Sequence, residues 1–551
     1  MMTRRELMQL AAGAVAANGA SRVYQLETFD YSGVRLLEGR FRTQFQGARD
    51  FYFNIPNDNL LWGFRQRAGL PAPGKSLGGW YGSDTFHAFG QYLSGMSRMA
   101  KAANDPALRE KVGELIAEWA KTIEPDGYFY YSRKPNSYHY VYEKMVCGLV
   151  DAYLYCGNKD AGRHLERITA WAERSLDRAR AVPLRGVDFS AQGQEWYTLA
   201  ENLYRAWQAT GEERYRNFAG LWHYADYWGM FNGSAPPDPY GRHAYSHVNT
   251  LSSAAMAHAA TSEPGYLTTI IRAYDWLQKT QVYATGGFGP GEKLMRPDGS
   301  LGKELESNAN TFETVCGSWA IFKLGRYLMS FTGQARYGDW MEKALYNGIG
   351  AALPMQPDGR NFYYSDYRLH QGRKIYNAKW VWSCCSGTYP QAIADYHNII
   401  YFTGPQALYV NLYVPSEVEW QGVKVRQETA YPEAASSQLT IEAAQPRKFA
   451  LRLRIPQWCE KASIKVDGQA QPIVCNAGEW AAVDRTWRNN ERVSIELPMR
   501  VAFAPVDEQH RRRVAAVYGP VVLVKRGDLK LVPFYAMGLD EAYEMYFDMT
   551  G

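Results

Sequence analysis

The chain has 551 residues, of which 46% are hydrophobic and 14% aromatic, and a net charge of +5. A single core rarely grows beyond ~300 residues, so this length predicts two or three domains. The small net charge and scattered basic residues exclude the basic surface of a nucleic-acid-binding protein. No run approaches the ~20 apolar residues of a membrane span.

The first 20 residues have the pattern of an export signal. The Arg4-Arg5 pair precedes a weakly apolar stretch from Leu10 to Ala17. This pattern resembles a twin-arginine signal, with cleavage near Ala17 or Ala20. The alternative is a frayed basic terminus. We therefore expect an exported protein, either periplasmic or secreted.

Residues 92–401 repeat one helical plan. In residues 203–219 and 326–345 an amphipathic helix ends at a Thr-Gly turn, and Arg-Tyr opens the next helix; residues 96–115 and 150–168 are looser copies. A turn glycine ends a helix in the left-handed conformation. Repeated helical hairpins form a toroid or a solenoid, and the irregular aromatic-rich loops favour the toroid. We predict an (α/α)6 barrel over residues 21–403.

The hydrophobic period changes to two after residue 404. Phe449, Leu451 and Leu453 alternate with Ala450 and arginines, and an Asp-Gly hairpin turn follows at residues 467–468. Alternation joined by such turns predicts an antiparallel β-sandwich, here over residues 404–502. Residues 503–551 contain further strand-like runs, which either complete the sandwich or form a second small sheet.

The seven cysteines are an odd number, so at least one remains unpaired. Cys147 and Cys156 lie in helical pattern and are predicted to be small core residues. Cys459 and Cys475 lie in the β-rich region, where they form a disulfide or remain free. The other three cysteines are considered together with a nearby carboxylate.

Glu313 and Cys316 are three residues apart on a predicted helix, so they are expected to share one face. Together with the adjacent Cys384 and Cys385 they supply four ligands of the kind that zinc prefers. The Ser-Gly step after the cysteine pair permits the sharp turn that lets both sulfurs reach one ion. The alternative is three unrelated buried cysteines.

Four motifs occur in a family-specific order: YATGGFGPGEKL, NANTFETVCGSWA, EKALYNG and WSCCSGTYP. The chain resembles glycoside hydrolase family 127, the β-L-arabinofuranosidases, over nearly its whole length. These are retaining enzymes that use a zinc-bound cysteine as nucleophile. The resemblance implies a zinc-dependent exo-glycosidase that acts on terminal L-arabinofuranosyl or related units of plant-type glycans.

The resemblance also implies roles for individual residues. Cys384 is expected to be the nucleophile and Glu292 the acid/base. Four residues are expected to hold Zn²⁺, and four others to contact the sugar: Glu313, Cys316, Cys384 and Cys385 for the metal; His139, His243, Glu342 and Tyr364 for the sugar.

Several positions depart from the family pattern. The metal carboxylate and cysteine are spaced E-x-x-C rather than E-x-C, and Gln91 and Glu143 stand where many relatives carry histidine. The loop after Glu292 is longer and contains Glu304 and Glu306, either of which is an alternative acid. These departures indicate a divergent subfamily, for which the sugar is left open between L-arabinofuranose and a related unit.

Two other functions fit the same residues. A polysaccharide lyase or epimerase on the same toroid would transfer protons through Tyr138, His139 and Tyr140, without a metal. A non-catalytic glycan-binding toroid would hold a closed structural zinc. The zinc content and the accessibility of Cys384 distinguish these functions. The sequence gives no prediction of oligomeric state.

Overall fold

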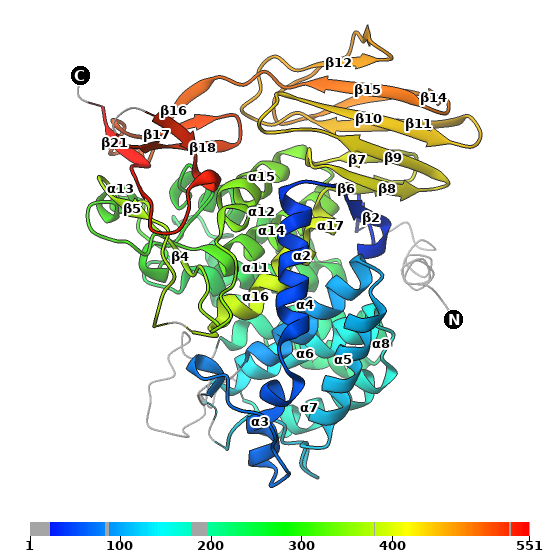
Figure 1. The fold of residues 1–551 in the computed structure, drawn as a ribbon, viewed down its shortest axis with the longest axis vertical. Coiled ribbons are helices and arrows are strands. Elements are labelled where there is room, and N and C mark those ends of the chain that lie inside the picture. The colour runs from blue at the N-terminus through cyan, green and yellow to red at the C-terminus, as the bar shows by residue number, and fades with distance from the viewer. Residues whose placement is uncertain are drawn as a thin grey trace.

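The computed structural model describes residues 23–82, 87–133, 135, 137–177, 195–379, 381–527 and 530–549. The predicted export signal lies outside these residues. Most of the β-strands gather at one end of the molecule, above a bundle of helices (Figure 1). Within the described ranges, no helix has the length and apolar character needed to cross a membrane.

Six described helices form a closed ring, which we call the inner ring. Each packs against the next one in chain order, and the last packs back against the first. Most of their residues are buried, because neighbouring elements surround them on every side. The inner ring comprises α4 (Ala88–Ala102), α6 (Tyr138–Tyr155), α8 (Leu199–Thr210), α11 (Ala244–Thr261), α14 (Thr314–Thr332) and α16 (Cys384–Ala394).

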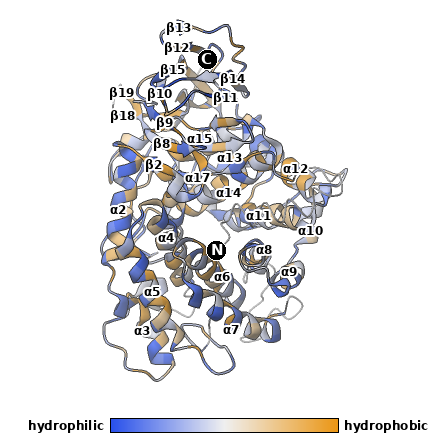
Figure 2. Ribbon diagram, turned by 90° about the vertical axis from the view of Figure 1, so that its right-hand side faces the viewer, coloured by the Kyte–Doolittle hydropathy of each residue, from blue (hydrophilic) through white to orange (hydrophobic). Residues whose placement is uncertain are grey.

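Outer helices cover the inner ring. Five of them follow an inner helix in the chain and pack against it, and α2 (Arg40–Asn54) packs against α16. Hydrophilic stretches mark outer helices such as α2 and α9 in Figure 2. The five are α5 (Pro106–Ala120), α7 (Lys159–Ser175), α9 (Glu213–Gly220), α12 (Pro264–Thr280) and α15 (Gly338–Asn347). The remaining helices are α3 (Asn57–Arg67), α10 (Ala225–Met230), α13 (Ser300–Glu304) and α17 (Tyr396–Ile399).

The predicted Thr-Gly turns are confirmed. Gly211 and Gly333 follow α8 and α14 directly, with φ of 79° and 70°. In both cases the glycine amide donates to a carbonyl four residues earlier, which ends the helix in the left-handed conformation.

Two larger sheets pack on the helices. Trp420 of one sheet and Phe449 of the other bring their rings to 5.1 Å between centroids. One sheet contains β1 (Glu27–Thr28), β6 (Tyr401–Gly404), β7 (Ala407–Val410), β11 (Arg447–Arg454) and β14 (Trp480–Trp487). The other contains β13 (Gln469–Ala470), β12 (Ser463–Val466), β15 (Glu491–Glu496), β10 (Ser436–Ala443), β9 (Val423–Glu428), β8 (Ser416–Trp420) and β2 (Val34–Leu36).

The strand pairing differs from the sequence prediction in two ways. Residues before α2 were assigned to the helical part, but β1 and β2 add an edge strand to each of the two sheets. In addition, β7 and β11 pair in parallel, whereas the other described pairs in these sheets are antiparallel. The chain therefore begins and ends its helical part against the same sheets.

The C-terminal strands form a sheet of their own. It contains β16 (Val501–Pro505), β17 (Arg513–Tyr518), β18 (Val521–Arg526), β19 (Lys530–Pro533) and β21 (Tyr546–Asp548). A short strand, β20 (Ala542–Tyr543), pairs instead with β5 (Gly372–Arg373) in the helical part. Of the two possibilities left open by the sequence, the structure has the separate sheet.

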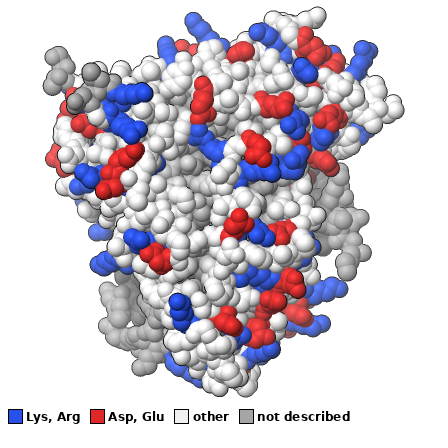
Figure 3. All heavy atoms as spheres, in the orientation of Figure 1, with Lys and Arg blue, Asp and Glu red and all other residues white. Residues whose placement is uncertain are grey.

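Charged side chains of both signs are interspersed over the face shown in Figure 3. This distribution matches the near-balance of 61 basic and 56 acidic residues in the chain.

Candidate active site

Four side chains meet at one point of the inner ring. The ligand atoms of Glu313, Cys316, Cys384 and Cys385 all lie within 4.8 Å of one another, and all four residues are buried. We call them the cysteine cluster. Sγ of Cys385 is 3.4 Å from Sγ of Cys316, and Oε1 of Glu313 is 3.4 Å from Sγ of Cys384. The seven cysteines are all free thiols.

Helix N-termini present the three sulfurs. Cys384 and Cys385 are the first two residues of α16, and Cys316 lies in the first turn of α14. Successive helical residues are rotated by about 100°, so adjacent cysteines on a helix can both border one site. The N-terminal end of a helix favours negative charge, which suits thiolates.

Glu313 reaches the cluster from outside the helix. It lies in β3 (Phe312–Glu313), where it pairs with Tyr364 of β4 (Tyr364–Ser365), and α14 begins only at Thr314. The prediction that Glu313 and Cys316 share a helix face is therefore wrong. Because the backbone is extended at Glu313, the E-x-x-C spacing still brings carboxylate and thiol together.

The cluster has the donor set of a zinc site. Cysteine sulfur and carboxylate oxygen are both zinc ligands, and two Zn–S bonds of ~2.3 Å at a tetrahedral angle place their sulfurs ~3.8 Å apart. The 3.4 Å between Sγ of Cys316 and Sγ of Cys385 is close to that separation. The residues present therefore fit a zinc ion.

The three sulfurs differ in acidity and access. Hydrogen bonds from Cys316 and Cys385 hold the pKa of the Cys384 thiol well below its usual value, whereas burial raises the pKa of the other two. Burial and the charge of Cys384 raise the pKa of Glu313 to about 8. Cys384 is 7% exposed, and the other two cysteines are 0% exposed. Cys384 thus has the lowest thiol pKa of the three cysteines and is the least buried of them.

A second carboxylate lies beside the cluster. Glu292 ends a short 3-10 turn (Pro290–Glu292), and its side chain is 30% exposed, against 4% for Glu313. It accepts a hydrogen bond from the Tyr364 hydroxyl. Gly289 supports this turn, because a Cβ there would lie 2.2 Å from Cβ of Ala244.

His243 connects the two carboxylates. It precedes α11, and its Nε2 lies 3.3 Å from Oε2 of Glu313 and 3.8 Å from Oε2 of Glu292. Its Nδ1 lies 2.6 Å from Oε1 of Glu195. Burial alone would lower the pKa of His243, but the carboxylates of Glu195 and Glu313 outweigh it and raise the pKa well above its usual value.

Two family models match the chain. The GH127 catalytic domain of beta-L-arabinofuranosidase matches residues 33–398, and the GH127 middle domain matches residues 407–499. The chain belongs to glycoside hydrolase family 127. The resemblance inferred from the sequence motifs is thereby confirmed.

Individual family 127 relatives are distant in sequence. A non-reducing end beta-L-arabinofuranosidase of Bifidobacterium longum subsp. longum is 22% identical over 293 residues, which cover 47% of this chain and 42% of that relative. A solved GH127 beta-arabinofuranosidase has a TM-score of 0.75 at 18% identity, over 96% of this chain and 98% of that one. Ara127N-Se, a GH127 beta-L-arabinofuranosidase from Geobacillus stearothermophilus T6, has a TM-score of 0.73 at 19% identity, over 94% of this chain and 99% of that one. At these identities the structural likeness concerns the fold.

Two of the predicted sugar contacts, Glu342 and His139, lie on helices α15 and α6. Glu342 lies on α15, where its carboxylate pairs with Arg454 of β11 at 2.8 Å and accepts from the Tyr431 hydroxyl at 2.8 Å. Its described contacts therefore join the helices to a sheet. His139 lies on α6, with its ring edge-on to Trp222 at 5.3 Å between centroids.

The alternative acids also lie elsewhere. Glu304 accepts from the Asn308 side chain at 3.0 Å. Glu306 pairs with Arg513 of the C-terminal sheet at 3.2 Å, and its side chain is 61% exposed. Among the described contacts, neither carboxylate meets the cysteine cluster, which leaves Glu292 beside it.

The two positions that depart from the family support the ring. Gln91 donates to Oγ1 of Thr388 at 2.8 Å, and this hydroxyl lies 3.1 Å from Sγ of Cys316. Glu143 pairs with Lys144 at 2.7 Å inside the ring. Gln91 therefore reaches the cluster through Thr388.

Sequence reasoning missed three residues of the site. The Tyr363 hydroxyl lies 3.3 Å from Sγ of Cys384, His87 hydrogen-bonds the same thiol, and Glu195 holds His243. Tyr363 could have been found from its place beside Tyr364. His87 and Glu195 carry no sequence signal, because only the closed ring brings them to the cluster.

Proposed function

We propose that this protein is a retaining exo-glycosidase that hydrolyses terminal L-arabinofuranosyl or related linkages. Cys384 would act as nucleophile and Glu292 as acid/base, with zinc held by Glu313, Cys316, Cys384 and Cys385. The supporting observation is that Cys384 lies with the other three predicted zinc ligands and is the least buried of the three cysteines, at 7% exposure against 0%. A catalytic zinc site needs a ligand position open to substrate, whereas a structural one is closed.

The proposed reaction has two displacements. The Cys384 thiolate attacks the anomeric carbon, the bond to the leaving oxygen breaks, and Glu292 donates its proton to that oxygen. Glu292 then removes a proton from water as the water oxygen attacks the anomeric carbon, and the electron pair of the C–S bond returns to Cys384. Each displacement inverts the configuration of the anomeric carbon, so the two together retain it.

Neighbouring residues contact both the Cys384 thiol and the Glu292 carboxyl group. Bound zinc would keep the thiol deprotonated and fix its direction. The hydroxyl of Tyr363 contacts Sγ of Cys384, and the hydroxyl of Tyr364 donates to Glu292. Tyr364 and His243 would also bind the sugar. Both contact Glu292, the carboxylate that would lie beside the glycosidic oxygen.

The fold supports the same proposal. We assign the closed inner ring with its outer helices to an (α/α)6 barrel within residues 21–403, and the two packed sheets to a β-sandwich within residues 404–502. The name of the Bifidobacterium relative favours β-L-arabinofuranosides as first substrates. Export to the periplasm or medium, by the twin-arginine-type pattern of residues 1–20, would place the enzyme beside plant-type glycans.

Activity on a panel of nitrophenyl furanosides and pyranosides tests the proposal. Cys384→Ser is expected to lose activity on the best substrate by ~10³-fold or more, as nucleophile removal does in other enzymes. Cys475→Ser, a half-buried thiol in the β-rich part, is the control and should keep wild-type activity. Wild-type turnover by Cys384→Ser would show that the nucleophile assignment is wrong.

Leaving-group dependence tests the acid. Glu292→Gln should slow poor leaving groups far more than nitrophenolate, because only the former need a proton in the transition state. Equal losses on both substrates would contradict the assignment of Glu292.

A further inference from the structure

The two oxygens of Glu313 have different neighbours. Oε1 lies 3.4 Å and 3.5 Å from Sγ of Cys384 and Cys385, and Oε2 lies 3.3 Å from Nε2 of His243. One oxygen thus borders the place of the proposed metal, and the other contacts the imidazole of His243. A carboxylate can rotate about its last bond, so a contact on Oε2 decides which oxygen faces the sulfurs.

His243 itself is held at its other nitrogen. Nδ1 lies 2.6 Å from Oε1 of Glu195 and 3.1 Å from Oγ of Ser246, which in turn lies 2.8 Å from the Tyr197 hydroxyl. The backbone of His243 also forms a bridge with Lys293. Ring and backbone are therefore both fixed, and Nε2 is aimed at Glu313.

Glu195 occupies a strained backbone position. Its φ is 45° and its ψ is 31°, a left-handed conformation that costs a non-glycine residue roughly 1–2 kcal/mol. The amide and hydroxyl of Thr198 both donate to the Glu195 carbonyl, at 3.1 Å and 2.9 Å. The side chain is only 12% exposed and points its carboxylate at His243. Strain maintained by such bonds is a reason to look for a function.

We propose that Glu195 and His243 form an outer layer of the metal site. This inference rests on the proposed zinc site. Glu195 orients the imidazole, and the imidazole holds Oε2 of Glu313 so that Oε1 faces the sulfurs. Both are positioning residues for the metal. Ligating carboxylates are commonly held in this way, and loss of such a partner weakens metal binding by ~10–100-fold.

The same imidazole also lies 3.8 Å from Oε2 of Glu292. One ring nitrogen therefore faces both the metal-site carboxylate and the proposed acid/base. The layer would set the position of these two carboxylates relative to each other. Glu195 would contribute to this arrangement without a contact of its own to the cluster.

Zinc affinity of the full-length protein, measured by competition with a chromophoric chelator, tests the inference. Glu195→Leu removes the acceptor at similar volume, and His243→Gln removes the imidazole. Each should weaken zinc binding by ~10–100-fold. Glu195→Gln keeps one acceptor oxygen for Nδ1 and should retain most of the affinity. The double variant Glu195→Leu/His243→Gln should bind zinc no more weakly than His243→Gln alone, because Glu195 acts through the ring.

The other end of α11 offers matched controls. Nδ1 of His258 lies 2.9 Å from the backbone oxygen of Glu263, far along the helix from His243. His258→Gln and Glu263→Leu should bind zinc with wild-type affinity, and circular dichroism checks that every variant is folded.

Wild-type zinc affinity in folded Glu195→Leu or in His243→Gln would overturn the inference. Additive losses in the double variant would overturn it as well. A wild-type protein that binds no zinc would instead overturn the proposed function, so the two failures are distinguishable.

Discussion

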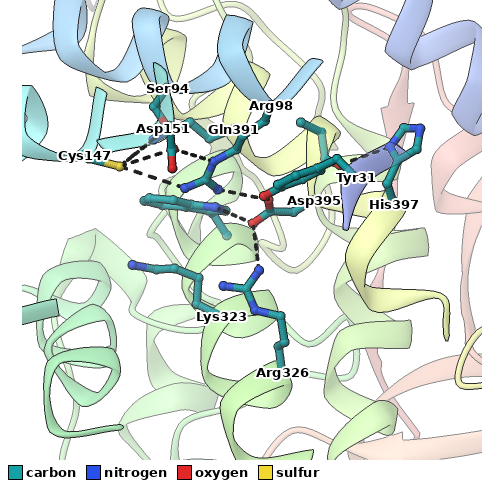
Figure 4. Close-up of polar contacts among 12 residues, drawn as sticks. Tyr31, Ser94, Arg98, Cys147, Asp151, Lys323, Arg326, Gln391, Asp395 and His397 are labelled. Carbon is teal, nitrogen blue, oxygen red and sulfur yellow. Dashed lines mark hydrogen bonds and ion pairs between the residues drawn. The ribbon is translucent and has the colours of Figure 1, made fainter. Parts of the chain in front are cut away.

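Two groups of polar side chains lie inside the same ring, one near each end of α14 and α16. The cysteine cluster lies at the N-terminal ends. Near the other ends lies a group that we call the Arg98 cluster (Figure 4). Cys384 and Asp395 are eleven residues apart, which corresponds to ~16 Å along a helix. The Arg98 cluster comprises Tyr31, Ser94, Arg98, Cys147, Asp151, Arg205, Trp319, Arg326, Gln391 and Asp395.

Each charged group of the Arg98 cluster lies within 4.0 Å of a group of opposite charge. Arg98 lies 2.7 Å from Asp151 and 2.9 Å from Asp395, and Arg205 also pairs with Asp151. The Tyr31 hydroxyl donates to Asp395 at 2.6 Å. Ion pairs and hydrogen bonds offset the desolvation free energy of the buried charges here. This group therefore requires no ligand.

The cysteine cluster does not balance its charges. Its donors are three thiols and one carboxylate, and burial raises the pKa of Cys316, Cys385 and Glu313, because the ionised forms have few opposite charges nearby. His243 is the one cationic group in described contact with Glu313. Buried anions without counter-charge are costly. The comparison teaches that buried charges can be paired within the protein, as around Arg98, whereas a cluster of sulfur and carboxylate donors without such partners has the composition expected of a metal site.

The largest effect on stability is expected in the Arg98 cluster. Arg98→Met leaves two buried carboxylates with fewer partners and should lower the free energy of unfolding by ~3–5 kcal/mol, measured by urea denaturation. Zinc affinity should not change. Arg163→Met, which breaks an exposed pair with Asp160, is the control with little expected loss. A small loss for Arg98→Met, or weaker zinc binding, would contradict the comparison.

In the cysteine cluster we expect a large loss of zinc affinity with little change in stability. Cys385→Ser should weaken zinc binding by more than the ~100-fold that loss of an outer-layer partner can cost. The stability of the metal-free protein should change little, because the metal-free cluster has no balancing partner to lose. Chelator competition and urea denaturation measure the two quantities. Unchanged zinc affinity would remove Cys385 from the ligand set.

The pH dependence of the metal-free protein provides a third test. The pKa of Glu313 is about 8 in the fold, against ~4.3 in an unfolded chain. Between these values the folded state binds the extra proton, so the stability that this group contributes is present at pH 4 and lost as the pH rises through 8. The melting temperature should fall more from pH 5 to 8 for wild type than for Glu313→Gln. Identical slopes for the two proteins would contradict the burial of this carboxylate.

The smallest effect is expected at Glu306. Its pair with Arg513 is exposed, so Glu306→Gln should change the stability by less than ~1 kcal/mol. Activity on the best furanoside should stay at the wild-type level. A large loss of activity would transfer the acid role from Glu292 to this loop.

Local pattern was sufficient to predict the repeating parts of the fold. The Thr-Gly turns at Gly211 and Gly333, and the buried alternation of Phe449, Leu451 and Leu453, occur as predicted. The strands β1 and β2 were missed because two or three residues show no period. Their pairing partners lie hundreds of residues away.

The site was predicted in composition but not in arrangement. Spacing and motif identified the four residues of the cysteine cluster, but not that Glu313 precedes its helix. The pairing of Glu342, which the family resemblance assigns to the sugar, with Arg454 of β11 was not predicted, because Arg454 lies in a distant strand. Cys147 is buried in the core as predicted, but its 3.5 Å contact with the Ser94 hydroxyl in the Arg98 cluster was not predicted. Such contacts depend on ring closure, which sequence spacing does not encode.

The metal content of the purified protein tests the central claim most directly. Elemental analysis should find one zinc per wild-type chain and almost none in Cys385→Ser prepared in the same way. A wild-type protein that remains free of zinc after incubation with excess Zn²⁺ and removal of the unbound metal would contradict the account.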